Sequence, residues 1–246
     1  MKEALGYFLA ITVIELITAI GEPVWGIFGH IIILITVILR SALIDRQSHQ
    51  QLLLSLALVP LVRIISLSMP LANIPQAWWY PIIYTPLLVA AVMVVRVLGL
   101  RAEDVGFIFR MLPVQLVVAL SGFMLGIAEY LILKPEAMIV ELTWQGIWPS
   151  ALILLVTTGF VEEFIFRGVL QRTAREAFGW WWGIVYVSLL FAVLHTGFLS
   201  WLDVVFVFVV ALFFGWVVKK TGSLLGVILA HGITNIMLFL VAPFFF

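Results

Sequence analysis

The 246 residues of this chain are 64% hydrophobic and only 11% charged, and the formal net charge is zero. Ordinary soluble domains carry about a quarter charged and roughly half apolar residues, so this composition excludes a soluble globular domain. The Lys and Arg residues form no basic face, which argues against a nucleic-acid partner. Cysteine is absent, which excludes disulfides, thiolate metal ligands and a cysteine nucleophile.

Apolar segments follow one another along the whole chain with short polar breaks. A helix needs about 20 residues to cross ~30 Å of hydrocarbon, and each segment approaches that length. The segments lie at residues 5–20, 24–44, 51–69, 78–98, 112–133, 147–170, 181–197, 202–218 and 223–244. The first two could instead form one helix bent at Gly21-Glu22-Pro23. The sequence therefore predicts an all-α fold, a polytopic transmembrane helical bundle of about 8–9 spans.

We expect a single membrane domain in two parts. Residues 1–100 hold N-terminal transmembrane helices, and residues 101–246 form a core that carries the polar motifs described below. No soluble domain fits between the spans. The N-terminal apolar run resembles a signal peptide but has no small-x-small cleavage site, so we expect an uncleaved first helix.

The basic residues predict an orientation. With the N-terminus in the cytoplasm, every Lys and Arg except Arg63 and Lys134 lies at a cytoplasmic span end. The positive-inside rule favours this arrangement. We therefore expect a multi-pass protein of the plasma (inner) membrane with a cytoplasmic N-terminus.

Three charged residues interrupt the apolar segment 147–170, namely Glu162, Glu163 and Arg167 in the run TTGFVEEFIFRGVLQR. Charges within hydrocarbon are costly and usually mark functional sites. On an ideal α-helix Glu163 and Arg167 share one face and can pair, which lowers the cost of burying both. Glu162 is turned about 140° from Arg167, which leaves it to face a cavity as an acid, base or ligand. A purely structural ion network of all three is the alternative.

Two later spans carry polar residues four positions apart. Phe191 and His195 occur in SLLFAVLHTGFL, and His231 and Asn235 occur in GVILAHGITNIM. A lone histidine on an apolar helix is more often structural than a ligand. Convergence of both histidines and Asn235 on Glu162, however, would create a polar pocket in the core of the bundle.

The other intramembrane polar residues match no motif. We expect each of them to pair with a neighbour or to extend toward the interface. They are Glu15, His30, Arg63, Glu129 and Asp203.

Three short motifs carry a family resemblance. EEFIFR, FAVLH and HGITN resemble, in this order, the motifs of the CAAX protease and bacteriocin-processing (CPBP, Abi) family of intramembrane proteases. The entry to the last span, KKTGSLLGVILAH, is also similar to that family. The resemblance covers about residues 100–240, and the first four spans are not diagnostic.

The resemblance implies roles for the motif residues. Glu162 would act as the base on a water that His195 helps to hold, and His231 and Asn235 would stabilise the oxyanion of the tetrahedral intermediate. Peptide hydrolysis needs both an activated water and donors where negative charge develops. Residues expected to support the site are Glu163, Arg167 and Phe191.

The sequence does not decide whether the reaction needs a metal cofactor. Glu162, His195 and His231 could equally hold a zinc ion with one open coordination position. A zinc-dependent reaction and a metal-free reaction are therefore both compatible with the sequence.

The resemblance implies an intramembrane endopeptidase that hydrolyses a peptide bond of a membrane-tethered peptide or protein, with prenylated substrates as one class. We expect the pocket to open toward the cytoplasmic half, because Glu162 and His231 each lie about eight residues, or ~12 Å of helix, from a cytoplasmic span end. The alternative is a non-enzymatic binding or assembly partner that retains the family pocket within a membrane complex.

Overall fold

The computed structural model describes residues 2–69 and 71–246. Helices occupy most of these residues, and none of them forms a strand. Nine helical segments in the described ranges are long and apolar enough to cross a bilayer. The prediction of an all-α, multi-span bundle is confirmed, and the chain is a multi-pass integral membrane protein.

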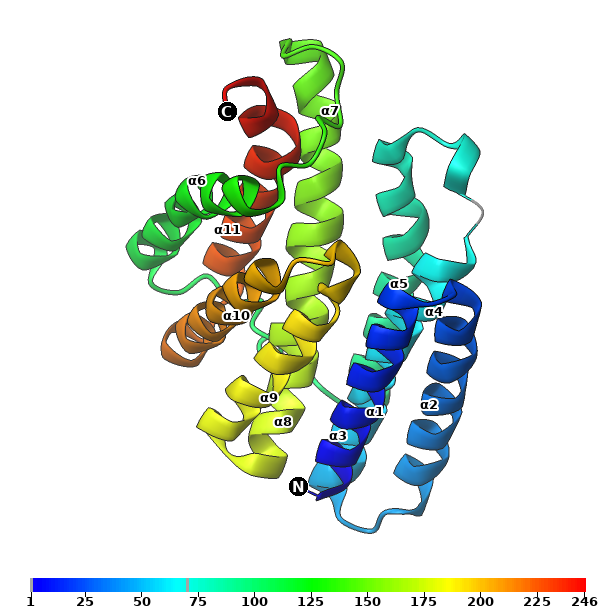
Figure 1. The fold of residues 1–246 in the computed structure, drawn as a ribbon. Helices are drawn as coiled ribbons and strands as arrows, with labels where there is room; N and C mark the ends of the chain where they lie inside the picture. The colour runs from blue at the N-terminus through cyan, green and yellow to red at the C-terminus, as the bar shows by residue number, and fades with distance from the viewer. Residues whose placement is uncertain (1, 70) are drawn as a thin grey trace.

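The N-terminal helices form one side of the bundle, to the right of the long central helix in Figure 1. The first two are separate helices that pack together, because Gly21 and Glu22 end one and Pro23 starts the next. This excludes the single bent helix. The elements of this part are α1 (Lys2–Ile20), α2 (Pro23–Leu43), α3 (Gln47–Leu56), α4 (Leu58–Ser68), η1 (Leu71–Asn73) and α5 (Gln76–Val97).

The remaining helices include the long central one and those on its other side (Figure 1). The central helix is continuous over Trp144–Phe178. The elements are α6 (Leu112–Leu133), α7 (Trp144–Leu154), η2 (Leu155–Glu162), η3 (Phe164–Leu170), α8 (Gln171–Phe178), α9 (Trp180–Val193), η4 (Thr196–Phe198), α10 (Trp201–Thr221), α11 (Leu225–Ile236), η5 (Met237–Val241) and η6 (Ala242–Phe244).

The central helix departs from the ideal α-helix assumed for residues 147–170. Both η2 and η3 are π-helical, and Glu163 is the single α-helical residue between them. π-Helical turns are rare and occur frequently at functional sites. The helix is also longer than expected, at 35 residues, so the residues of the EEFIFR motif lie near its middle.

Glycines bring α11 unusually close to two neighbours. A Cβ added to Gly122 of α6 would lie 2.4 Å from the carbonyl oxygen of Ala230. One added to Gly159 of η2 would lie 3.0 Å from the Cα of Gly232. Small residues of this kind let helix backbones approach closely in membranes. The helix that carries His231 and Asn235 is therefore held by backbone contact against the helix that carries Glu162.

The polar residues outside the motifs follow the pairing expectation only in part. Glu15 Oε1 accepts from Arg63 Nε at 2.6 Å, which confirms pairing for these two residues. His30 Nε2 lies 3.0 Å from the same oxygen, but neither ring nitrogen of His30 has a hydrogen-bond partner among the described residues. Asp203 is fully buried, but neither of its carboxylate oxygens has a hydrogen-bond partner among the described residues. The pairing expectation is therefore wrong for Asp203. Glu129 forms no ion pair with any described residue and lines the cavity described below.

The two ends of the third span offer a test of orientation. Asp45 lies in the loop before α3, Asn73 lies in η1 after α4, and both are exposed. With a cytoplasmic N-terminus, Asn73→Cys should react with a membrane-impermeant thiol reagent in intact cells, and Asp45→Cys only after permeabilisation. The unmodified chain is the blank, since it contains no cysteine. Labelling from the opposite sides would contradict the positive-inside assignment.

Candidate active site

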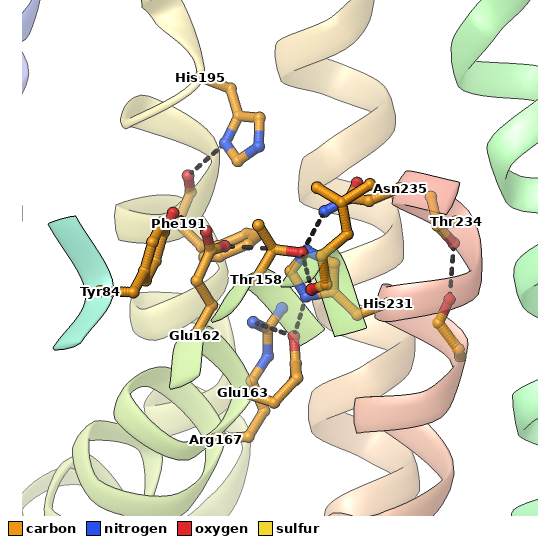
Figure 2. A network of polar contacts seen from close by, with 12 residues as sticks. Tyr84, Thr158, Glu162, Glu163, Arg167, Phe191, His195, His231, Thr234 and Asn235 are labelled. Carbon is orange, nitrogen blue, oxygen red and sulfur yellow. Dashed lines mark hydrogen bonds and ion pairs between the residues drawn. The ribbon is translucent and has the colours of Figure 1, made fainter. Parts of the chain in front are cut away.

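The four residues expected to act in catalysis line one cavity of about 390 Å³. Glu162, His195, His231 and Asn235 reach it from the central helix, the end of α9, and α11. Figure 2 shows these side chains converging from separate helices. The packing therefore brings together residues that are far apart along the chain.

The cavity lies in the half of the bundle away from the N-terminus. Its lining includes Gln76 and Tyr80 from the first turns of α5, Ser66 from the end of α4, and Phe198 beyond the end of α9. The expectation of an opening toward the end that carries the N-terminus is therefore wrong. The reason is helix length, since Glu162 lies near the middle of a 35-residue helix rather than near its end.

Glu162 receives a hydrogen bond that the sequence did not predict. The hydroxyl of Tyr84 on α5 donates to Glu162 Oε1. The Tyr80 ring stacks on that of Tyr84, with centroids 6.4 Å apart and an interplanar angle of 13°. Nothing local to Tyr84 signals this role, because its partner lies 78 positions away in the chain.

Glu163 is fully buried and binds two partners. Its Oε1 accepts from Arg167 Nη1 at 2.9 Å, which confirms the predicted pair, and lies 2.8 Å from His231 Nδ1. Arg167 also stacks on Phe191, with its Cζ 4.3 Å from the ring centroid. Glu163 therefore links the central helix to α11 in addition to neutralising Arg167.

The contact with Glu163 determines what His231 can offer the cavity. Because Nδ1 donates to the carboxylate, Nε2 is an acceptor in the neutral ring and a donor only in the imidazolium. Nε2 lies 3.8 Å from Glu162 Oε2. Glu162 and Glu163 thus lie on two sides of the ring.

His195 lies just beyond the last residue of α9 rather than inside a helix. Its Nδ1 is 3.1 Å from the carbonyl oxygen of Phe191, and its ring centroid is 5.1 Å from the Phe191 ring. A carbonyl accepts only, so Nδ1 carries the proton and Nε2 is left as an acceptor. The supporting role expected for Phe191 is consistent with these contacts.

Asn235 is oriented by a threonine that was not singled out from the sequence. Its Nδ2 donates to Thr158 Oγ1 at 2.8 Å, and that hydroxyl donates to the Leu154 carbonyl at 2.6 Å. One amide N–H of Asn235 stays available to a ligand. The signal for Thr158 was its position one turn before Glu162 in TTGFVEE.

The side chains expected as zinc ligands do not form a zinc site. Across residues 2–69 and 71–246, no three His, Asp or Glu side chains lie close enough together to share a metal ion. Glu162, His195 and His231 therefore do not fit a zinc site in this arrangement.

Comparison with known families gives one finding. Residues 144–237 match a family model described as "Type II CAAX prenyl endopeptidase Rce1-like". Searches of curated proteins and of solved structures give no match. All three motifs fall within the matched residues, and the family implies a protease of the CAAX type. Residues 144–237, which carry the three motifs, are thus similar to the Rce1-like family of type II CAAX prenyl endopeptidases.

Proposed function

We propose that this protein is an intramembrane endopeptidase that hydrolyses a peptide bond of a membrane-tethered substrate, with prenylated peptides as the first class to test. The observation that carries the proposal is the convergence of Glu162, His195, His231 and Asn235, all within the Rce1-like residues 144–237, on one cavity. This set supplies a base, an acceptor and donors in one place.

Glu162 and His195 are suited to hold the attacking water. Both the carboxylate and the free Nε2 are acceptors, so a water between them donates one hydrogen to each and keeps a lone pair for the substrate carbonyl. As the oxygen attacks, its proton passes to Glu162, which later delivers it to the leaving nitrogen. The Tyr84 hydroxyl keeps the Glu162 side chain in place during both transfers.

Asn235 and His231 are suited to stabilise the oxyanion. The free amide N–H of Asn235 and the Nε2–H of a His231 imidazolium are the two donors available there. The Glu163 carboxylate accepts a hydrogen bond from Nδ1 of this imidazolium, and Arg167 donates to the same carboxylate. Donors fixed before the reaction stabilise developing charge most effectively, because they need little reorganisation.

The oxyanion assignment predicts the effect of two matched variants. Asn235→Ala should lower kcat on the order of 10²-fold, because one donor is lost in the transition state. Thr158→Val should lower kcat by a smaller factor, since Asn235 remains but loses its orienting hydroxyl. Steady-state kinetics on both variants measures the difference. A wild-type kcat in Asn235→Ala would remove that residue from the oxyanion site.

A cleavage assay separates the enzyme from the alternative. The purified protein in lipid nanodiscs is incubated with a farnesylated CAAX peptide, and the released products are quantified by mass spectrometry. The proposal requires many turnovers per protein molecule. A non-enzymatic binding or assembly partner would instead hold the peptide in a stoichiometric complex without cleaving it.

A further inference from the structure

A cluster of charged residues on the N-terminal helices reaches the active-site cavity through Arg63. Arg63 of α4 lines the same cavity as Glu162 and His195. It lies outside the three motifs and outside the Rce1-like residues 144–237. Its function is therefore not explained by the reaction derived above.

The contacts of Arg63 fix its guanidinium and leave part of it free. Its Nε donates to Glu15 Oε1 at 2.6 Å, and Glu15 itself is fully buried. His30 is also fully buried and brings Nε2 to within 3.0 Å of the same oxygen. No described residue accepts from the two terminal amino groups of Arg63, whose side chain is 17% exposed. Held at Nε, the guanidinium presents these two amino groups as free donors.

The other guanidinium at this cavity is more deeply buried and partly engaged. The Arg167 side chain is 1% exposed, pairs with Glu163 through Nη1 and stacks on Phe191, and its Nη2 is buried without a partner among the described residues. Arg63 instead has both terminal amino groups free on a partly exposed side chain that lines the cavity, which makes it the arginine better placed to bind a ligand. Terminal guanidinium nitrogens match the two oxygens of a carboxylate, and such charge-assisted pairs are among the stronger hydrogen bonds.

We propose that Arg63 binds the C-terminal carboxylate of the substrate, so that the cavity accepts the end of a chain in preference to an internal segment. This inference rests on the proposed function. Arg63 and Glu162 line one cavity of about 390 Å³, and an extended residue spans only about 3.3–3.6 Å. A carboxylate held by Arg63 therefore brings peptide bonds near the chain end within reach of Glu162.

Peptide binding tests the inference without requiring turnover. Isothermal titration calorimetry compares a farnesylated CAAX peptide with its C-terminal carboxamide on the unmodified protein in nanodiscs at 4 °C, with intact peptide verified afterwards. The carboxylate peptide should bind on the order of 10-fold to 100-fold more tightly, the range expected for hydrogen bonds to a charged group. Equal affinities, or no binding of either peptide, would overturn the proposal.

The variants are chosen to keep the protein folded. Arg63→Gln should abolish the preference, but it leaves Glu15 buried without its cation. The double variant Glu15→Gln/Arg63→Gln removes both charges and should also bind the two peptides equally. Arg40→Gln is the matched control, because Arg40 pairs with Glu3 on an exposed part of α1 and α2. A preference that persists in the double variant would overturn the proposal.

Two further comparisons complete the test. A carboxamide peptide ending in glutamate should bind as weakly as the plain carboxamide; restored binding would show that Arg63 reads an acidic side chain, contrary to the proposal. Turnover is then measured on the same samples. An Arg63-dependent preference without cleavage refutes the peptidase but supports the carboxylate site. Cleavage with equal affinity for both peptides refutes the carboxylate site and supports the peptidase.

Discussion

Glu162→Gln is expected to lower kcat by up to about 10⁴-fold, the upper range for loss of a general base. The amide keeps the shape of the side chain, and its oxygen can still accept from Tyr84. It cannot take the proton of the attacking water. Product release from the farnesylated peptide measures the loss, and the thermal unfolding temperature in detergent checks that the variant is folded.

Glu129→Gln is the matched control for this experiment. Glu129 lines the same cavity from α6 but belongs to none of the motifs. The same exchange of carboxylate for amide should there leave kcat close to that of the unmodified protein. Turnover at the wild-type rate in Glu162→Gln would remove Glu162 from the mechanism.

The buried pair formed by Glu163 and Arg167 should give the largest stability effects. Removing either partner leaves the other charge buried alone, at a cost of roughly 3–5 kcal/mol in the free energy of unfolding. The double variant Glu163→Gln/Arg167→Gln should lose less than the sum of the single changes. The free energy of unfolding in detergent is measured for the unmodified protein, both single variants and the double variant.

Turnover and the free energy of unfolding should not change in parallel among these variants. Glu163 also holds His231, so stability regained in the double variant should not bring back turnover. Arg167→Gln retains the contact between Glu163 and His231 and should keep more activity than Glu163→Gln. The pair Glu162→Gln and Arg167→Gln should show little coupling. A coupling as large as that of Glu163 with Arg167 would mean that the two glutamates have exchanged roles.

The spans and the Glu163–Arg167 pair were predictable because each depends on residues close in the chain. Long apolar runs determine which segments cross the bilayer, and a spacing of four determines which charges meet on one helix. The three motifs also indicated which separate helices share a site. These predictions needed no knowledge of how the N-terminal helices pack.

The features that could not be predicted depend on packing between distant segments. Tyr84 reaches Glu162 only because α5 lies against the central helix. Thr158 gains its role from Asn235 on α11. The opening of the cavity was wrongly predicted because the polar residues after Leu170 were taken as the end of the span, whereas the central helix continues through them to its C-cap at Gly179. The unpartnered carboxylate of Asp203 has no signal in its local sequence.

The backbone contact between Gly159 and Gly232 has a consequence for temperature. Gly159 lies three residues before Glu162, and Gly232 lies three residues before Asn235. This backbone contact therefore fixes the position of Glu162, the proposed base, relative to Asn235, the proposed oxyanion donor. Neither glycine at the contact has a side chain that could rotate. We therefore expect warming to leave this alignment unchanged as long as the two helices stay in contact. An Arrhenius plot of turnover should consequently remain straight until the two helices separate, and then fall abruptly.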